Sequence, residues 1–96
     1  MAEFRLTPAA ERDLEGIWRY TCARWGTDQA IRYTDDLIHT FAVLADSPLL
    51  AQACHFLRPG YRRKRMGHHV IYLMPVSHGV DIVRILHVRM MPGRHL

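Results

Sequence analysis

The sequence has little cysteine and no long apolar run. Its two cysteines among 96 residues, Cys22 and Cys54, make neither a disulfide framework nor the spaced ligand set of a zinc site. No apolar run approaches the roughly 20 residues that span a bilayer, and the opening Met-Ala-Glu-Phe-Arg lacks a signal-peptide pattern. These absences predict a soluble cytoplasmic protein with free thiols, folded as a single domain over residues 1–96.

Acidic residues are scarce in the second half of the chain. Residues 49–96 carry seven arginines and Lys64 against Asp81 alone, a net charge of +7. Residues 1–48 carry five arginines against eight acids, a net charge of −3. Clustered basic charge attracts polyanions or acidic protein surfaces. The pattern therefore indicates either a partner of that kind or a solvated basic face without a dedicated partner.

The sequence contains no recognisable metal or cofactor motif. His68 and His69 are adjacent, so on a strand their side chains point to opposite faces and cannot easily share one ion. Arg58-Pro59-Gly60 is a turn signal rather than a glycine-rich phosphate loop. Neither cysteine has a histidine or acid motif beside it. We expect no cofactor, no metal and no cysteine nucleophile.

The first half predicts a short strand at Phe4–Leu6 followed by two helices. Thr7 precedes Pro8, a pair that starts helices because Thr caps free N–H groups and Pro fits the first turn. Gly26 ends the first helix, and we expect Thr27 to cap a second one that stops at residues 46–48. Because the link between the two helices is so short, we expect them to form an antiparallel helical hairpin. The apolar faces comprise Ala10, Leu14, Ile17, Trp18 and Thr21 in the first helix, and Ala30, Thr34, Leu37, Ile38, Phe41, Leu44 and Ala45 in the second.

The second half predicts a loop over residues 49–60 and then three strands. The strands are Tyr61–Met66, His69–Met74 and Val80–Val88, separated by turns at Gly67 and at residues 77–79. Short turns make neighbouring strands antiparallel, and the apolar run of the third favours a central strand covered in part on both faces. The order β-α-α-β-β-β defines an α+β fold, with the helical hairpin packed on a twisted, mainly antiparallel sheet.

Basic side chains on these strands suit two different functions. Arg63 and Arg65 share one face of their strand, and His87 and Arg89 share one face of the last strand, with Arg84 on the opposite one. Side chains of this kind can stabilise a phosphodiester transition state, and a histidine can move a proton. No partner carboxylate or terminal tyrosine completes such a site, so the spacing favours a basic face that docks onto an acidic partner.

The last residues, Met90 to Leu96, contain two methionines and two basic groups. Flexible methionine surfaces often serve protein contacts, and the alternative is a frayed end. Trp18 and Trp25 are expected in the core rather than at an interface.

Several runs of residues together carry a family resemblance. In the second half they are Pro59-Gly60-Tyr61-Arg62-Arg63, Gly67-His68-His69-Val70-Ile71-Tyr72, Val83-Arg84-Ile85-Leu86-His87-Val88-Arg89-Met90 and Arg94-His95-Leu96. In the first half they are Ala10, Asp13, Leu14, Ile17, Tyr20, Trp25, Gly26, Gln29, Ala30, Tyr33 and the helix end from Leu44 to Pro48. In order and spacing, these residues closely resemble ParE toxins of the RelE/ParE superfamily, which belong to type II toxin–antitoxin systems.

The resemblance implies the same β-α-α-β-β-β fold and a toxin that poisons DNA gyrase by protein binding, with no catalytic residues of its own. It implies neutralisation by a ParD-like antitoxin with a ribbon-helix-helix part, in a hetero-oligomer that touches operator DNA only through the antitoxin. An acidic antitoxin tail would run across the basic half of the toxin. The residues expected to contact target or antitoxin are Arg63, Arg65, His87, Arg89, Arg94, His95 and Leu96.

The RelE branch supplies an alternative, a ribosome-dependent mRNA endonuclease. There His87 is the acid–base group, and Arg65 and Arg89 hold the phosphate. RelE-like toxins often carry a tyrosine near the C-terminus, and its absence from residues 94–96 counts against nuclease activity. Met91 also departs from ParE toxins, which often have an acidic residue there. A third alternative is an inactive toxin fold that binds its antitoxin and serves only operon autoregulation.

Overall fold

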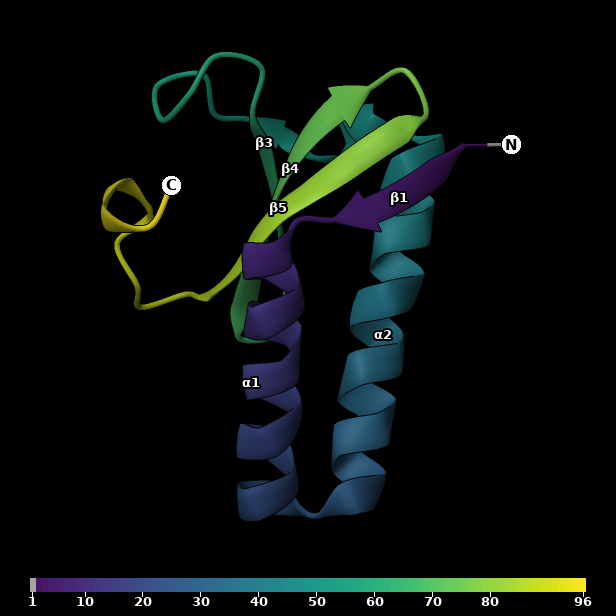
Figure 1. Ribbon diagram of the computed structural model, residues 1–96, viewed down its shortest axis with the longest axis vertical. Coiled ribbons are helices and arrows are strands. Elements are labelled where there is room, and N and C mark those ends of the chain that lie inside the picture. The colour runs from purple at the N-terminus through teal and green to yellow at the C-terminus, as the bar shows by residue number, and fades with distance from the viewer. Residues whose placement is uncertain (1) are drawn as a thin grey trace.

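A helical hairpin packs on one face of a five-stranded sheet (Figure 1). The computed structural model describes residues 2–96. Its elements are β1 (Glu3–Leu6), α1 (Pro8–Trp25), α2 (Thr27–Asp46), β2 (Gln52–Ala53), β3 (Arg62–Met66), β4 (His69–Val76) and β5 (Gly79–His87), with short 3-10 helices at Pro48–Leu50 and Pro92–Arg94. This order confirms the predicted α+β fold.

The sheet has the strand order β1-β5-β4-β3-β2. As their short turns predict, β3, β4 and β5 pair antiparallel, while β1 lies parallel to β5 at one edge. Gln52 and Ala53 form the opposite edge strand, β2, where a loop was predicted, because two residues are too few to show a strand pattern. β4 continues through Pro75, whose missing N–H is tolerated because β3 pairs with β4 no further than Leu73.

Both helices begin and end close to their predicted positions. The Thr7 hydroxyl accepts the N–H of Ala10 at 3.1 Å, and Pro8 takes the first helical position. The prediction that Thr27 caps α2 is wrong, since Thr27 is the first residue of α2 and Gly26 is the cap position of both helices. A one-residue link leaves no place for a separate capping residue. Within residues 2–96, no helix combines the length and the apolar character needed to cross a membrane.

The main core lies between the hairpin and the sheet. Its fully buried side chains include Leu37, Phe41, Leu44, Ile71, Leu73, Val80 and Ile82. Two residues predicted to be buried are not, because Ile38 is 40% exposed and Trp25 is 66% exposed. Ile38 lies at the margin of the apolar stripe of α2, beside Leu37. Trp25 ends α1, at the tip of the hairpin that reaches past the sheet (Figure 1).

A smaller apolar cluster covers the other face of the sheet. Its buried members are Cys54, Tyr72 and Leu86, with Leu57, Tyr61, Val70 and Leu96 packed against them. Burial raises the pKa of the Cys54 thiol and of the Tyr72 hydroxyl. β5 therefore buries side chains on both faces of the sheet, which confirms the predicted central strand.

Two turns of the sheet depend on glycine. Gly67, between β3 and β4, has φ +59°, and a Cβ there would lie 2.7 Å from Oη of Tyr33. Gly79, the first residue of β5 after the β4–β5 turn, has φ +143°, and a Cβ there would lie 2.1 Å from the carbonyl oxygen of Glu3. Positive φ and close packing both exclude larger residues. The turns predicted at these two glycines are confirmed.

Candidate functional site

The hairpin continues past the sheet and forms one wall of an open groove. Figure 1 shows α1 and α2 side by side, running on beyond the strands. The other wall is the β3–β4 turn and the end of β5, and the groove has a volume of about 1310 Å³. Tyr20 and Trp25 line the helical wall and are 62% and 66% exposed. A space this large and open suits a peptide segment better than a small molecule.

The groove is strongly basic. Five arginines line it, namely Arg12, Arg24, Arg32, Arg65 and Arg89. Among residues 2–96, the one carboxylate in its lining is that of Asp13, which is ion-paired with Arg84. Because arginines of both halves of the chain meet here, the −3 and +7 halves of the sequence do not form two separate surfaces. A lining of this charge attracts an acidic partner.

Three histidines, His68, His69 and His87, lie on the sheet wall of the groove. The prediction that His68 and His69 point to opposite faces is wrong, because His68 lies in the turn before β4. The ring of His87 lies edge-on to His69 at a centroid distance of 5.5 Å and stacks on His68 at 6.4 Å. Over the part of the chain that the structure describes, no three side chains are grouped as metal ligands.

The ring nitrogens of two of these histidines are engaged. Nδ1 of His69 lies 2.6 Å from the hydroxyl oxygen of Tyr33. Burial, followed by the nearby His87 and His68, lowers the pKa of His69 to about 4. Nδ1 of His87 accepts the N–H of Arg89 at 3.1 Å, so the neutral His87 ring carries its proton on Nε2. At neutral pH the ring of His69 is therefore uncharged, although it lies within a basic groove.

The groove brings together three of the predicted site residues, Arg65, His87 and Arg89. β5 ends at His87, so Arg89 lies in the following turn and does not share a strand face with His87 as predicted. Nε of Arg65 donates to the carbonyl oxygen of Gly67 at 3.2 Å, which holds Arg65 at the β3–β4 turn. Arg63 stands apart, with its guanidinium 5.2 Å from the ring centre of Phe56.

The predicted tail residues lie away from the groove, on the opposite face of the sheet. Leu96 packs against the cluster that contains Tyr72 and Leu86. The side chains of Arg94 and His95 are exposed. Residues 91–96 are therefore folded back onto the sheet, and the predicted site residues are divided between the groove and this segment.

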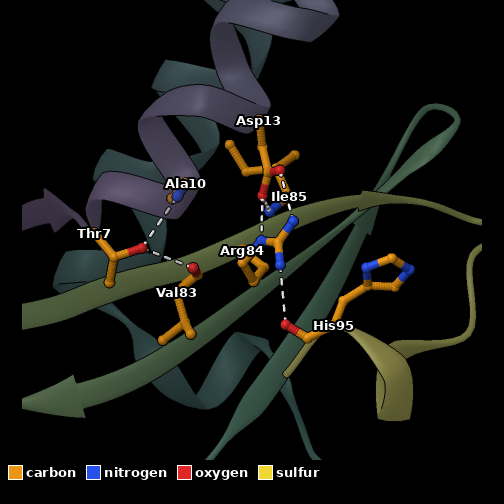
Figure 2. A network of polar contacts seen from close by, with 7 residues as sticks. All are labelled: Thr7, Ala10, Asp13, Val83, Arg84, Ile85 and His95. Carbon is orange, nitrogen blue, oxygen red and sulfur yellow. Dashed lines mark hydrogen bonds and ion pairs between the residues drawn. The ribbon is translucent and has the colours of Figure 1, made fainter.

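Asp13 and Arg84 form a polar network that joins α1, β5 and this segment (Figure 2). Nε of Arg84 donates to Oδ2 of Asp13 at 2.7 Å, and Nη2 donates to Oδ1 at 2.9 Å. The hydrogen bond to Asp13 raises the pKa of Arg84. Oδ2 of Asp13 also accepts the N–H of Ile85, and Nη1 of Arg84 donates to the carbonyl oxygen of His95, both at 2.9 Å.

The network exists because β5 extends beyond β1. β1 pairs with β5 only as far as Ile82, and α1 covers the open edge that follows. The Thr7 hydroxyl donates to the carbonyl oxygen of Val83 at 2.8 Å, and Asp13 accepts from Ile85 (Figure 2). Sequence reasoning did not identify this role of Asp13. The sequence signal for this role was the spacing of Asp13, which lies three residues after Ala10 and therefore on the buried face of α1.

Known proteins share both this fold and this sequence pattern. A solved structure of the chromosomal ParDE TA system from P. aeruginosa superposes with a TM-score of 0.77 at 19% identity, covering 93% of this chain and 98% of that one. That similarity shows the fold. The family described as "ParE toxin of type II toxin-antitoxin system, parDE" matches residues 4–92. The chain belongs to the ParE toxin family, as the resemblance predicted.

Curated relatives match the chain over nearly its whole length. Toxin ParE1 of Mycobacterium tuberculosis (strain CDC 1551 / Oshkosh) is 41% identical over 96 residues, covering 99% of this chain and 98% of the relative. Toxin ParE1 of Caulobacter vibrioides is 40% identical, covering 100% and 99%. Toxin ParE of Escherichia coli is 37% identical over 91 residues, covering 94% and 88%. The chain is thus the toxin of a type II toxin–antitoxin system.

Proposed function

We propose that this toxin poisons DNA gyrase by binding it and catalyses no reaction of its own. The observation that carries the proposal is the whole-length similarity to proteins named ParE and ParE1, since gyrase poisoning is the activity that this resemblance implies. The chemistry of the groove supports binding. The Asp13 carboxylate is held by Arg84, and Nδ1 of His87 is held by the backbone of Arg89, so both acceptors are already occupied.

A ParD-like antitoxin with a ribbon-helix-helix part neutralises the toxin by laying an acidic tail in the groove. The five arginines supply charge complementarity, and Tyr20 and Trp25 supply exposed aromatic area. Gly16 of α1 also lines the groove, and a Cβ there would meet nothing within 4 Å. Glycine inside a helix costs about 1 kcal/mol relative to alanine. The fold itself does not require glycine at position 16. A partner backbone that approaches α1 closely at this position explains why a glycine stands there.

The complex forms in the cytoplasm and is a hetero-oligomer of toxin and antitoxin. Operator DNA is contacted only through the ribbon-helix-helix part of the antitoxin. The toxin acts when the antitoxin is lost and the groove becomes accessible.

A supercoiling assay with purified components tests the proposal. Toxin alone should inhibit DNA supercoiling by gyrase, and an equimolar amount of antitoxin should restore it. Inhibition that antitoxin does not relieve would contradict the neutralisation mechanism. Absence of inhibition at micromolar toxin would contradict gyrase poisoning itself.

The groove also supports a second candidate, ribosome-dependent mRNA cleavage, because it gathers Arg65, His87 and Arg89. In such a reaction His87 would be the acid–base group, and Arg65 and Arg89 would hold the phosphate. His87→Ala should then lower cleavage by about 100-fold or more. Unchanged cleavage in that variant would exclude His87 as the acid–base group. A toxin that affects neither gyrase nor ribosomes would favour a role limited to operon autoregulation.

A further inference from the structure

The segment that follows β5 is attached to the sheet at few points. The N–H groups of Arg94, His95 and Leu96 form hydrogen bonds within the segment, to Met91 and Pro92. Leu96 packs against the apolar cluster on the second face of the sheet. Within residues 2–96, the one hydrogen bond that ties residues 91–96 to another element runs from Nη1 of Arg84 to the carbonyl oxygen of His95, at 2.9 Å.

Arg84 makes this bond with a guanidinium that is already fixed from its other side. Its Nε and Nη2 hold both carboxylate oxygens of Asp13, and the two side chains are only 21% and 14% exposed. Asp13 is in turn fixed by α1 and by the N–H of Ile85. The donors of a guanidinium form a rigid planar fork, so holding two of them sets the direction of the third. The place of the His95 carbonyl is thus set by α1 through Arg84 (Figure 2).

The segment held in this way displays side chains suited to a protein contact. Met91 is 61% exposed, and Arg94 and His95 also face solvent. A terminal segment held by one apolar side chain alone frays readily. A frayed segment must be ordered again when it binds, and that ordering lowers affinity.

We propose that Arg84 is a positioning residue, which clamps residues 91–96 to α1 and β5 and so presents Arg94 and His95 to the toxin's target. The inference rests on the proposed function in one respect, namely that this segment touches gyrase. The clamp itself can be tested without gyrase.

The first experiment measures backbone order in residues 92–96 by nitrogen-15 NMR relaxation in Arg84→Lys and in the wild type. A lysine ammonium cannot hold both oxygens of Asp13 and the His95 carbonyl in one plane. Order parameters in the segment should fall from about 0.85 to below about 0.6. The matched control is Arg19→Lys, in the exposed ion pair with Glu15 on α1, which should leave the segment ordered.

The second experiment measures gyrase inhibition by the same variants and by Leu96→Ala, which releases the segment without touching the Asp13–Arg84 pair. Arg84→Lys and Leu96→Ala should each raise the inhibitory concentration by about tenfold. Arg19→Lys should behave as the wild type.

Two results would overturn the proposal. Residues 92–96 that stay ordered in Arg84→Lys would show that Arg84 is not the clamp. If residues 92–96 become mobile in Arg84→Lys while gyrase inhibition is unchanged, the clamped position of the segment is not used in binding gyrase. If the wild type fails to inhibit gyrase, the proposed function fails, and the relaxation comparison still accepts or rejects the clamp.

Discussion

Gly16 gives the sharpest prediction at the scale of single residues. Gly16→Ala should raise the free energy of unfolding by about 1 kcal/mol, because alanine favours the helix and its Cβ meets no neighbour. The same change should weaken antitoxin binding by about tenfold or more, because it fills the space left for the partner backbone. Urea unfolding and titration calorimetry measure the two effects.

The control for Gly16→Ala reverses its effect on stability and leaves antitoxin binding alone. Ala23 is exposed on α1 and does not line the groove. Ala23→Gly should destabilise the toxin by about 1 kcal/mol and leave antitoxin affinity unchanged. If Gly16→Ala stabilises the toxin and binds antitoxin as tightly as the wild type, the antitoxin does not approach α1 at Gly16.

His69 predicts a pH dependence of stability. Its pKa is about 4 in the folded protein against 6.5 as the ordinary value, with Tyr33, His87, His68 and Asp13 as the surrounding groups. Between these two values the unfolded chain binds a proton that the folded chain does not, so stability falls as pH drops from 6.5 towards 4. His69→Gln should make that fall shallower in urea unfolding at a series of pH values.

Exposed His39 on α2 provides the control for His69. His39→Gln should keep the wild-type pH profile of the unfolding free energy. An unchanged profile in His69→Gln would contradict the assignment of a neutral, half-buried His69.

Three of the site residues predicted from strand spacing lie together in the structure, although Arg89 lies in the turn after β5 and not on the strand. Arg65, His87 and Arg89 follow from the basic pattern of the last strands, and all three line the groove. The Asp13–Arg84 pair joins residues 71 positions apart, and no local pattern specifies such a contact. Arg12, Arg24 and Arg32 were likewise missed, because the hairpin's orientation over the sheet decides which arginines face the groove.

At the scale of elements, the packing of α2 on the sheet supplies a matched pair of substitutions. Leu37 is fully buried, and its neighbour Ile38 is 40% exposed. Leu37→Ala should reduce the free energy of unfolding by about 2–5 kcal/mol, and Ile38→Ala by less than about 1 kcal/mol. Urea unfolding of the two variants measures the difference. Similar losses at both positions would contradict the orientation of α2.

Sequence periodicity predicts the type and order of the helices and strands. It predicts the residues at which they begin and end less accurately. The two helices have regular apolar faces, and the strands β4 and β5 contain apolar runs. The basic strand β3 (Arg62–Met66) was predicted from the turn signals on either side of it. Thr27 was misplaced because its capping preference is local, whereas Gly26 closes both helices in a one-residue link. Arg89 was placed on a strand because sequence does not show that β5 loses its partner at His87.

At the scale of the whole molecule, the basic groove predicts a salt-dependent interaction. Arg65→Glu should lower antitoxin affinity by about tenfold or more at low salt, and the effect should shrink as salt rises. The matched control is Lys64→Glu, because Lys64 is the preceding residue of β3 and does not line the groove. Calorimetry at two ionic strengths measures both variants. Equal losses in the two would show that net charge, and not the groove, governs binding.

Whether this ParE-family toxin poisons gyrase by binding it is best tested by the trapping of cleaved DNA. Purified toxin should cause gyrase to accumulate protein-linked, cleaved plasmid in proportion to toxin concentration, and antitoxin should prevent it. The contradicting result is gyrase that is unaffected at micromolar toxin while ribosome-bound mRNA is cleaved in a manner that requires His87.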